Sequence, residues 1–207
     1  MCIDVIILTC SSKIGGRCVA GIDNDGNWVR LVSNDQHSNG AIPRNMLYYE
    51  NGGYCQPLDV VRVPIIGALP SVHQPENILV DRTKKWRKLG VAALDRILQL
   101  HPTEHHTLIY GSTSPFATES DLRLIHYSLI LIEVSSLRTY IVETTNGPRT
   151  RASFLYNGHS YSNISVTDPD YFDSHRCGYI GNSILVISIP DEPIPPEQYY
   201  KFIAKIY

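Results

Sequence analysis

Residues 11–33 read SSKIGGRCVAGIDNDGNWVRLVS, and this stretch decides how the first half of the chain folds. Two β-rich runs, at 17–23 and 28–33, flank the dipeptide Asp25-Gly26. Asp-Gly between two such runs is a strong short-range signal for a β-hairpin with a two-residue turn. The stretch therefore predicts an antiparallel hairpin close to the amino terminus.

A two-residue turn would set the register of this hairpin, and alternation along each strand would then separate its faces. In that register Asp23 lies opposite Trp28, and Gly21 lies opposite Arg30. One face would hold only small or apolar side chains, and we expect it to form core: Cys18, Ala20, Ile22, Val29 and Leu31. The other face would gather Arg17, Gly21, Asp23, Trp28 and Arg30.

The mixed face has two interpretations. An indole offers a stacking surface to a nucleobase, and arginine offers both a phosphate fork and a planar stacking partner. Trp28, Arg17 and Arg30 would then contact a ligand. Lys13, beside Arg17, would contact a phosphoryl group of that ligand. Alternatively, Asp23 pairs with one of the arginines and Trp28 covers a hydrophobic edge. The spacing leaves both interpretations open.

The rest of the 207 residues is dominated by further β-rich runs that Gly, Asn, Asp and Pro separate. Ten strands are predicted: 3–9, 17–23, 28–33, 60–66, 127–134, 139–144, 149–156, 159–166, 184–189 and 200–206. This is a mainly β protein. The number of strands suits two five-stranded barrels.

One helix is predicted after Gly90, in the stretch VAALDRILQL. Its apolar residues recur at helical spacing, and His101-Pro102 should end it. The stripe consists of Val91, Leu94, Ile97 and Leu98. Such a helix would be suited to close the base of a barrel.

Composition suggests where the chain divides. The segment 100–122 is rich in Thr, Ser, Pro and Gly, which is typical of a junction. We expect a first barrel with the helix over 1–111 and a second barrel over 112–207. A long irregular segment at 34–57 interrupts the first half, where a binding loop would fit.

Two more basic groups occur along the chain. The run DRTKKWRK at 81–88 places Lys85 and other cations around Trp86, a combination that single-stranded nucleic acid requires. In the stretch RTRASFLYNGHSYSNISV at 149–166, Arg149 and Arg151 project to one side of a strand near the Asn157-Gly158 turn. The alternative is that such runs are ordinary solvent-exposed surface.

Charge and composition exclude several classes. With 43% hydrophobic and 18% charged residues, and without an apolar run of membrane-spanning length, the chain is expected to be a soluble cytoplasmic protein. Five cysteines without a C-x-x-C pair predict neither a disulfide framework nor a zinc ribbon. A formal net charge of −2 argues against sequence-independent coating of duplex DNA. Before Gly111, Lys and Arg slightly outnumber Asp and Glu, so a nucleic-acid groove is expected in the first half.

No motif of an enzyme is found. The chain lacks a G-x-S-x-G elbow, a Walker A run and a G-x-G-x-x-G run, and we expect no cofactor. The acidic segment 167–177 fits neither a calcium loop nor a zinc site, so no metal is expected. Asp168 before Pro169 instead has the pattern of a helix cap.

Several runs resemble, in order, the dual OB-containing domain family of prokaryotes. The most specific are K-x-G-G-R-C at 13–18 with W-V-R-L-V-S at 28–33, Q-P-E-N at 74–77 and S-V-T-D-P at 165–169. The resemblance spans nearly the whole chain and implies two OB-type barrels in tandem, one in each half. OB barrels often bind single-stranded nucleic acid, but also oligosaccharides and proteins. The resemblance to this family implies no catalytic residue.

Together these observations favour a non-enzymatic module that binds single-stranded nucleic acid or a nucleotide-like ligand. The residues expected to contact it are Lys13, Arg17, Trp28, Arg30, Lys85, Trp86, Arg149 and Arg151. The alternative is a protein-interaction or regulatory subunit that docks a catalytic partner such as a nuclease or ATPase. A phosphoryl-transfer or hydrolytic enzyme using Lys13, Arg17 and the region around Asn77 is the third hypothesis.

Overall fold

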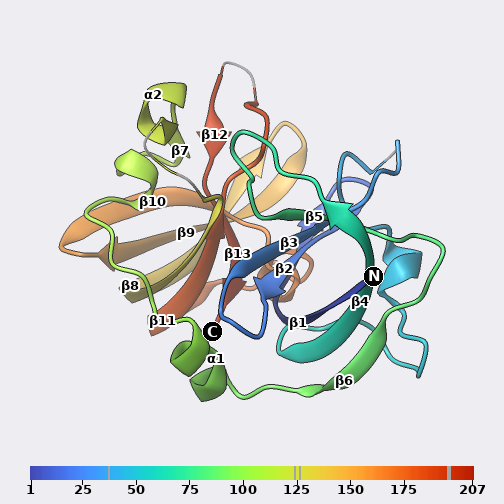
Figure 1. Cartoon of the computed structure of the whole chain (residues 1–207). Coiled ribbons are helices and arrows are strands. Elements are labelled where there is room, and N and C mark those ends of the chain that lie inside the picture. Colours follow the sequence, from blue (N-terminus) through green and yellow to red (C-terminus); the bar gives the residue numbers. More distant parts are fainter. Residues whose placement is uncertain (37, 124, 126, 195–196) are drawn as a thin grey trace. The chain divides into compact units, whose positions relative to one another are not determined.

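The structure is a computed structural model that describes residues 1–36, 38–123, 125, 127–194 and 197–207. Its chain forms two compact units: residues 1–71 with 75–102, and residues 72–74 with 103–207 (Figure 1). The division into folding domains at residue 111 stays a prediction.

Five strands of the first unit pair in a ring. They are β1 (Cys2–Lys13), β2 (Gly16–Ile22), β3 (Trp28–Val32), β4 (Asp59–Ala68) and β5 (Asn77–Val80). The order is β1-β2-β3-β5-β4, and antiparallel pairing of β4 with β1 closes the ring. Only the β3–β5 pair in this ring is parallel. A further strand, β6 (Arg87–Val91), extends the sheet beside β4.

The second unit contains a closed barrel with the same connectivity (Figure 1). Its strands are β8 (Leu129–Thr144), β9 (Gly147–Tyr156), β10 (His159–Val166), β11 (Gly178–Ser188) and β13 (Phe202–Ile206). In both rings the third strand runs parallel to the fifth and the fourth pairs with the first. A small ladder joins β7 (Phe116–Ala117) to β12 (Tyr199–Tyr200). The prediction of a mainly β chain with two OB-like barrels is confirmed.

Helical segments are short. They are η1 (Arg44–Leu47), α1 (Leu94–Leu100), η2 (Ile109–Gly111), α2 (Glu119–Leu122) and α3 (Pro169–Phe172). The predicted helix exists as α1 and ends at His101 as expected, but Val91 belongs to β6 and is 65% exposed. The Asp168 cap is confirmed, since its carboxylate accepts the N–H of Asp170. None of the helices among the described residues is long and apolar enough to span a membrane.

The predicted register of the first hairpin is wrong by one residue. Ile22, not Asp23, lies opposite Trp28, and Ala20 lies opposite Arg30. The loop has three residues because Gly26 adopts a φ of 82° and the Asp23 carboxylate accepts the N–H groups of residues 25 and 27. Arg17 therefore lies on the opposite face from Trp28 and Arg30.

Several strand assignments also change. The runs predicted at 127–134 and 139–144 form one continuous strand, β8. The short strand β5 was not predicted, although its sequence NILV closes the first ring between β3 and β4. The described residues between β3 and β4 form η1 and isolated bridges but no further strand, so the predicted loop insertion is confirmed.

Gly16 shows how the first barrel accommodates that insertion. A β-carbon at Gly16 would lie 2.2 Å from the carbonyl oxygen of Ile42, a backbone atom that cannot swing aside. The same region is tied by two backbone hydrogen bonds of 2.9 Å between Arg17 and Ile42. Glycine is therefore required where the insertion packs onto the start of β2.

Replacing Gly16 with alanine should destabilise the protein by about 1 to 3 kcal/mol, because the clash forces a backbone shift. The matched control is Gly67→Ala on β4, where an added β-carbon meets no atom within 4 Å. Urea unfolding of both variants measures the difference. Equal stabilities of the two variants would contradict the packing argument.

Lys201 is a buried cation of the second unit, with 1% of its surface exposed. Its Nζ donates to the carbonyl oxygen of Ser112 at 2.6 Å and to the Ser112 hydroxyl at 3.1 Å, and it lies 5.9 Å from the ring centre of Tyr161. Burial lowers the pKa of Lys201 to about 7, although the charge of Asp121 works against this shift. The amine thus ties residue 112 to the start of β13.

The low pKa of Lys201 predicts a pH-dependent contribution to stability. Between about pH 7 and the ordinary lysine pKa of 10.5, the unfolded state binds the proton that the folded state has released. Stability relative to a Lys201→Met variant should therefore rise with pH in this window, by at most about 1.4 kcal/mol per pH unit. Urea unfolding of both proteins at pH 6.5, 8 and 9.5 tests this, and a constant difference would contradict it.

Candidate nucleic-acid interface

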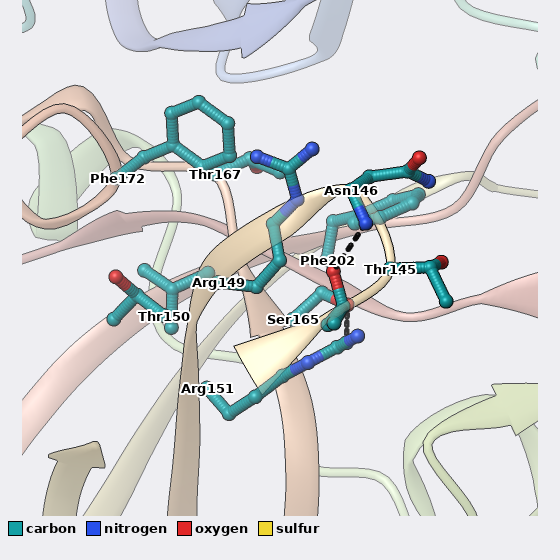
Figure 2. Close-up of a pocket in the computed structure, with 11 residues that line it drawn as sticks. Thr145, Asn146, Arg149, Thr150, Arg151, Ser165, Thr167, Phe172 and Phe202 are labelled. Atoms are coloured by element: carbon teal, nitrogen blue, oxygen red, sulfur yellow. Dashed lines mark hydrogen bonds between the residues drawn. The ribbon is translucent and has the colours of Figure 1, made fainter. Parts of the chain in front are cut away.

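A pocket of about 320 Å³ opens on the outer surface of the second barrel (Figure 2). It lies over β9, β10 and β13 and is bounded by the β8–β9 turn and by α3. The residues that line it are Thr144, Thr145, Asn146, Arg149, Thr150, Arg151, Ser165, Val166, Thr167, Phe172 and Phe202. Two of the sequence-predicted residues, Arg149 and Arg151, therefore come together in one pocket.

Strand alternation places both arginines outside the barrel. On β9, the intervening side chains of Thr150, Ala152 and Phe154 are buried. Arg149 and Arg151 consequently point away from the core, as the spacing predicted.

A row of four outward-facing residues crosses the barrel strands at Arg151. Tyr140 of β8 lies opposite Arg151, which lies opposite Ser165 of β10, which in turn pairs with Phe202 of β13. Directly paired residues share a face, so two aromatic side chains flank an arginine and a hydroxyl. The Tyr140 hydroxyl accepts the backbone N–H of Asn163 at 3.0 Å, which fixes the ring at the edge of this row.

The two guanidinium groups have different surroundings. The Arg149 guanidinium lies 5.6 Å from the ring centre of Phe172, toward which it points in Figure 2. Arg151 donates to the hydroxyl of Ser165, while its buried Nε has no hydrogen-bond partner among the described residues. Within the same part of the chain, neither guanidinium has a carboxylate oxygen within 4.0 Å. No described carboxylate therefore pairs directly with either positive charge.

The walls of the pocket are held by local hydrogen bonds. In the β8–β9 turn, the Thr144 hydroxyl donates to the carbonyl of Gly147 at 2.7 Å and accepts the N–H of Asn146 at 3.3 Å. On the other side, the Thr150 hydroxyl donates to the carbonyl of Tyr171 at 2.9 Å, which keeps α3 beside β9. These bonds hold Phe172 near Arg149 before any ligand arrives.

A buried ion pair strengthens the anchor of α3. The Lys205 Nζ lies 3.2 Å from one Asp168 oxygen and 2.6 Å from an Asp170 oxygen. Asp168 also accepts the N–H of Ile206 at 3.0 Å. Burial nevertheless raises the pKa of Asp168, because desolvation outweighs these favourable partners.

The first-half candidates are not gathered in one place. Arg30 is buried, and its Nε lies 3.0 Å from Glu76 Oε1, with side-chain exposures of 6% and 7%. Trp28 is half-buried with its ring centre 4.9 Å from that of His101, in an edge-to-face arrangement. This supports the structural interpretation of the mixed face, in which arginine pairs with a carboxylate and the indole covers an edge, although the carboxylate is Glu76 and not Asp23.

The basic run at 81–88 separates in the same way. Lys85 is exposed, but Trp86 is fully buried in the core of the first barrel, so its indole presents no face to a base. The expectation that Trp86 stacks on a ligand does not fit this position. Lys13 is exposed at the β1–β2 turn, and Arg17, half-buried, donates to the Ser12 hydroxyl.

The aromatic members of the pocket were not predicted from the sequence. Phe172 and Phe202 lie 23 and 53 residues beyond Arg149 in the chain, and only the barrel pairing brings them beside it. Ser165 could have been found, since it begins the S-V-T-D-P motif that continues into the α3 cap.

The buried Arg30–Glu76 pair predicts a stability effect rather than a binding effect. Arg30→Met should cost about 3 to 5 kcal/mol because it leaves the Glu76 carboxylate buried without its guanidinium. The double variant Arg30→Met/Glu76→Met should recover much of this loss, since neither charge is then buried alone. Chemical unfolding of the single and double variants measures the coupling, and strictly additive losses would contradict it.

Comparisons with known proteins address the fold. A search of curated proteins gave no match, and neither did a search of solved structures. A family model described as a dual OB-containing domain matches residues 3–206. The match covers both rings of strands, whose shared connectivity is described above. The chain therefore belongs to the dual OB-containing domain family.

Proposed function

We propose that the second barrel binds single-stranded nucleic acid, or a nucleotide-like ligand, in the pocket around Arg149 and Arg151, and that it does so without catalysing a reaction. One observation carries the proposal: two arginines with no carboxylate partner among the described residues share an outward-facing pocket with Phe172 and Phe202. Arginine supplies the phosphate fork, and the rings supply stacking surfaces.

The place of the pocket on the barrel supports this proposal. OB folds bind oligonucleotides on the face of their second and third strands, next to the loop between the first and second. Here β9 and β10 are the second and third strands, and the turn at 144–147 joins the first to the second. The pocket lies at this position.

Single strands fit the pocket better than a duplex. A base must be unstacked to meet an aromatic side chain, and bases in a duplex are already stacked on each other. The volume of about 320 Å³ lies at the lower end of small-ligand sites, which suits one nucleotide unit. The net charge of −2 further disfavours duplex coating.

The sequence placed the nucleic-acid groove in the first half, from the distribution of charge. The pocket transfers the proposal to the second unit, because ion pairs reduce the cations available in the first: Arg62 pairs with Asp4, Arg82 with Asp35, and Lys88 with Asp59. For ligand binding, whether a cation is already in an ion pair matters more than the total number of cations in a unit.

A second candidate function is docking of a catalytic protein partner. Tyr179 is 73% exposed and Ile180 is 36% exposed at the start of β11, and Leu155 on β9 is 42% exposed. Exposed aromatic side chains are enriched in protein interfaces. This candidate predicts a stable complex that does not depend on Arg149 or Arg151.

Fluorescence anisotropy with short single-stranded DNA and RNA at several salt concentrations tests the proposal. Binding should weaken as salt rises, and Arg149→Ala/Arg151→Ala should reduce the magnitude of the salt slope by about 1.4, at about 0.7 per lost phosphate contact on a single strand. Phe202→Ala should weaken binding by about 1 to 3 kcal/mol if a base stacks on this ring.

Arg123→Ala serves as the control, because it removes one exposed charge from the same unit outside the pocket. It should bind as the unchanged protein does. Absence of binding at low salt, or equal loss in Arg123→Ala and in the arginine pair variant, would contradict the proposal. A duplex of equal length should bind more weakly.

A further inference from the structure

The first barrel carries its own group of basic and aromatic side chains, which lie at its β1–β2 turn and on the insertion between β3 and β4. We call it the first-barrel cluster, and it consists of Lys13, Arg17, Arg44, Tyr48 and Tyr54. None of the pocket residues of the second barrel belongs to it.

Tyr48, Arg17 and Arg44 of the cluster lie around Tyr54. The Tyr48 and Tyr54 rings lie 5.0 Å apart at 74°, and their backbones form an isolated bridge. Burial raises the pKa of Tyr54, while a hydrogen bond from Arg17 and the charge of Arg44 act to lower it. Two guanidinium groups therefore lie near one phenol.

The backbone holds this arrangement in place. Arg17 exchanges two hydrogen bonds with Ile42, so the insertion is tied to the start of β2. Gly16 allows the close approach of the Ile42 carbonyl, and η1, which begins at Arg44, follows two residues later. Backbone contacts between the insertion and β2 therefore hold the cluster in place.

Its position corresponds to that of the second-barrel pocket. In each ring the first two strands meet at a two-residue turn, closed by the pair Lys13–Gly16 in one and Thr144–Gly147 in the other. In each, the connection from the third to the fourth strand supplies an aromatic side chain, Tyr48 here and Phe172 there. Both barrels thus carry basic and aromatic side chains at the first turn and on this connection. The two arginines face opposite sides of their strands, however, since Arg17 directly follows Gly16 and Arg149 is two residues beyond Gly147.

The exposed members of the cluster are available to a ligand. Lys13 and Arg44 are exposed and have no carboxylate oxygen within 4.0 Å among the residues that the structure describes. Tyr48 is 57% exposed, which is unusual for so large an aromatic side chain. Cations beside an exposed ring provide phosphate contacts and a stacking surface.

We propose that the first-barrel cluster is a second subsite for the same class of ligand, a nucleotide unit of single-stranded nucleic acid. This inference rests on the function proposed above and adds to it that each barrel contributes a site. One molecule should accordingly bind two short oligonucleotides that are each too short to occupy more than one site.

Equilibrium dialysis with a thymidine trinucleotide at low salt tests this stoichiometry. The unchanged protein should bind two trinucleotides. The variant Arg44→Ala/Tyr48→Ala should bind one, because its remaining site is in the second barrel, and Arg149→Ala/Arg151→Ala should likewise bind one. The affinity at the substituted site should fall at least about tenfold, as expected when a stacked base is lost.

The control variant Arg96→Ala/Tyr179→Ala loses one exposed arginine and one exposed tyrosine outside both sites and should still bind two. A second readout is ultraviolet cross-linking of a 4-thiothymidine trinucleotide, with expected attachment within residues 44–54 as well as within the pocket. Circular dichroism confirms that each variant is folded.

The outcomes separate the two proposals. One bound trinucleotide that Arg149→Ala/Arg151→Ala abolishes and Arg44→Ala/Tyr48→Ala leaves intact would overturn the second subsite and retain the proposed function. Two bound trinucleotides in Arg44→Ala/Tyr48→Ala would overturn it as well. No binding by the unchanged protein would overturn both.

Discussion

Closure of five strands into a ring is the constraint on which the rest of this structure depends. Once the fourth strand pairs with the first and the third runs beside the fifth, each residue of a strand must point either into the barrel or out of it. Val5, Ile7 and Val19 fill one interior, and Ile132, Phe154 and Tyr161 fill the other. The same alternation leaves Arg149 and Arg151 outside, beside strands that are distant in the chain.

Charge pairing then separates structural cations from cations that can bind a ligand. Arg30 pairs with Glu76 out of water, and Lys205 pairs with Asp168 behind α3. These pairs support the fold, because removal of one partner leaves a buried charge. Arg149 instead lies over a phenylalanine ring, and Arg151 meets a serine hydroxyl, so their charges remain available to an anion. The proposed binding face follows from this difference.

Much of the fold could be predicted from the sequence, and less of the site. The apolar run of β1, the β-rich runs of β9 and β10 and the Asp168-Pro169 cap are local signals, and the structure agrees with them. The first hairpin was misread because Asp-Gly also suits a three-residue loop, and one residue of register moved Arg17 to the other face. Trp86 illustrates the remaining limit: basic neighbours suggested a surface indole, but burial is decided by tertiary packing that a local pattern does not contain.

The central claim is that the outer face of β9 and β10 binds single-stranded nucleic acid. Its most direct test is an NMR titration of the isotope-labelled protein with a short single-stranded oligonucleotide, following backbone amides and arginine Nε–H signals together. The largest shifts should occur at residues 144–151, at Ser165 and at the Arg149 and Arg151 side chains. Shifts confined to the exposed start of β11, or none at low salt, would contradict it.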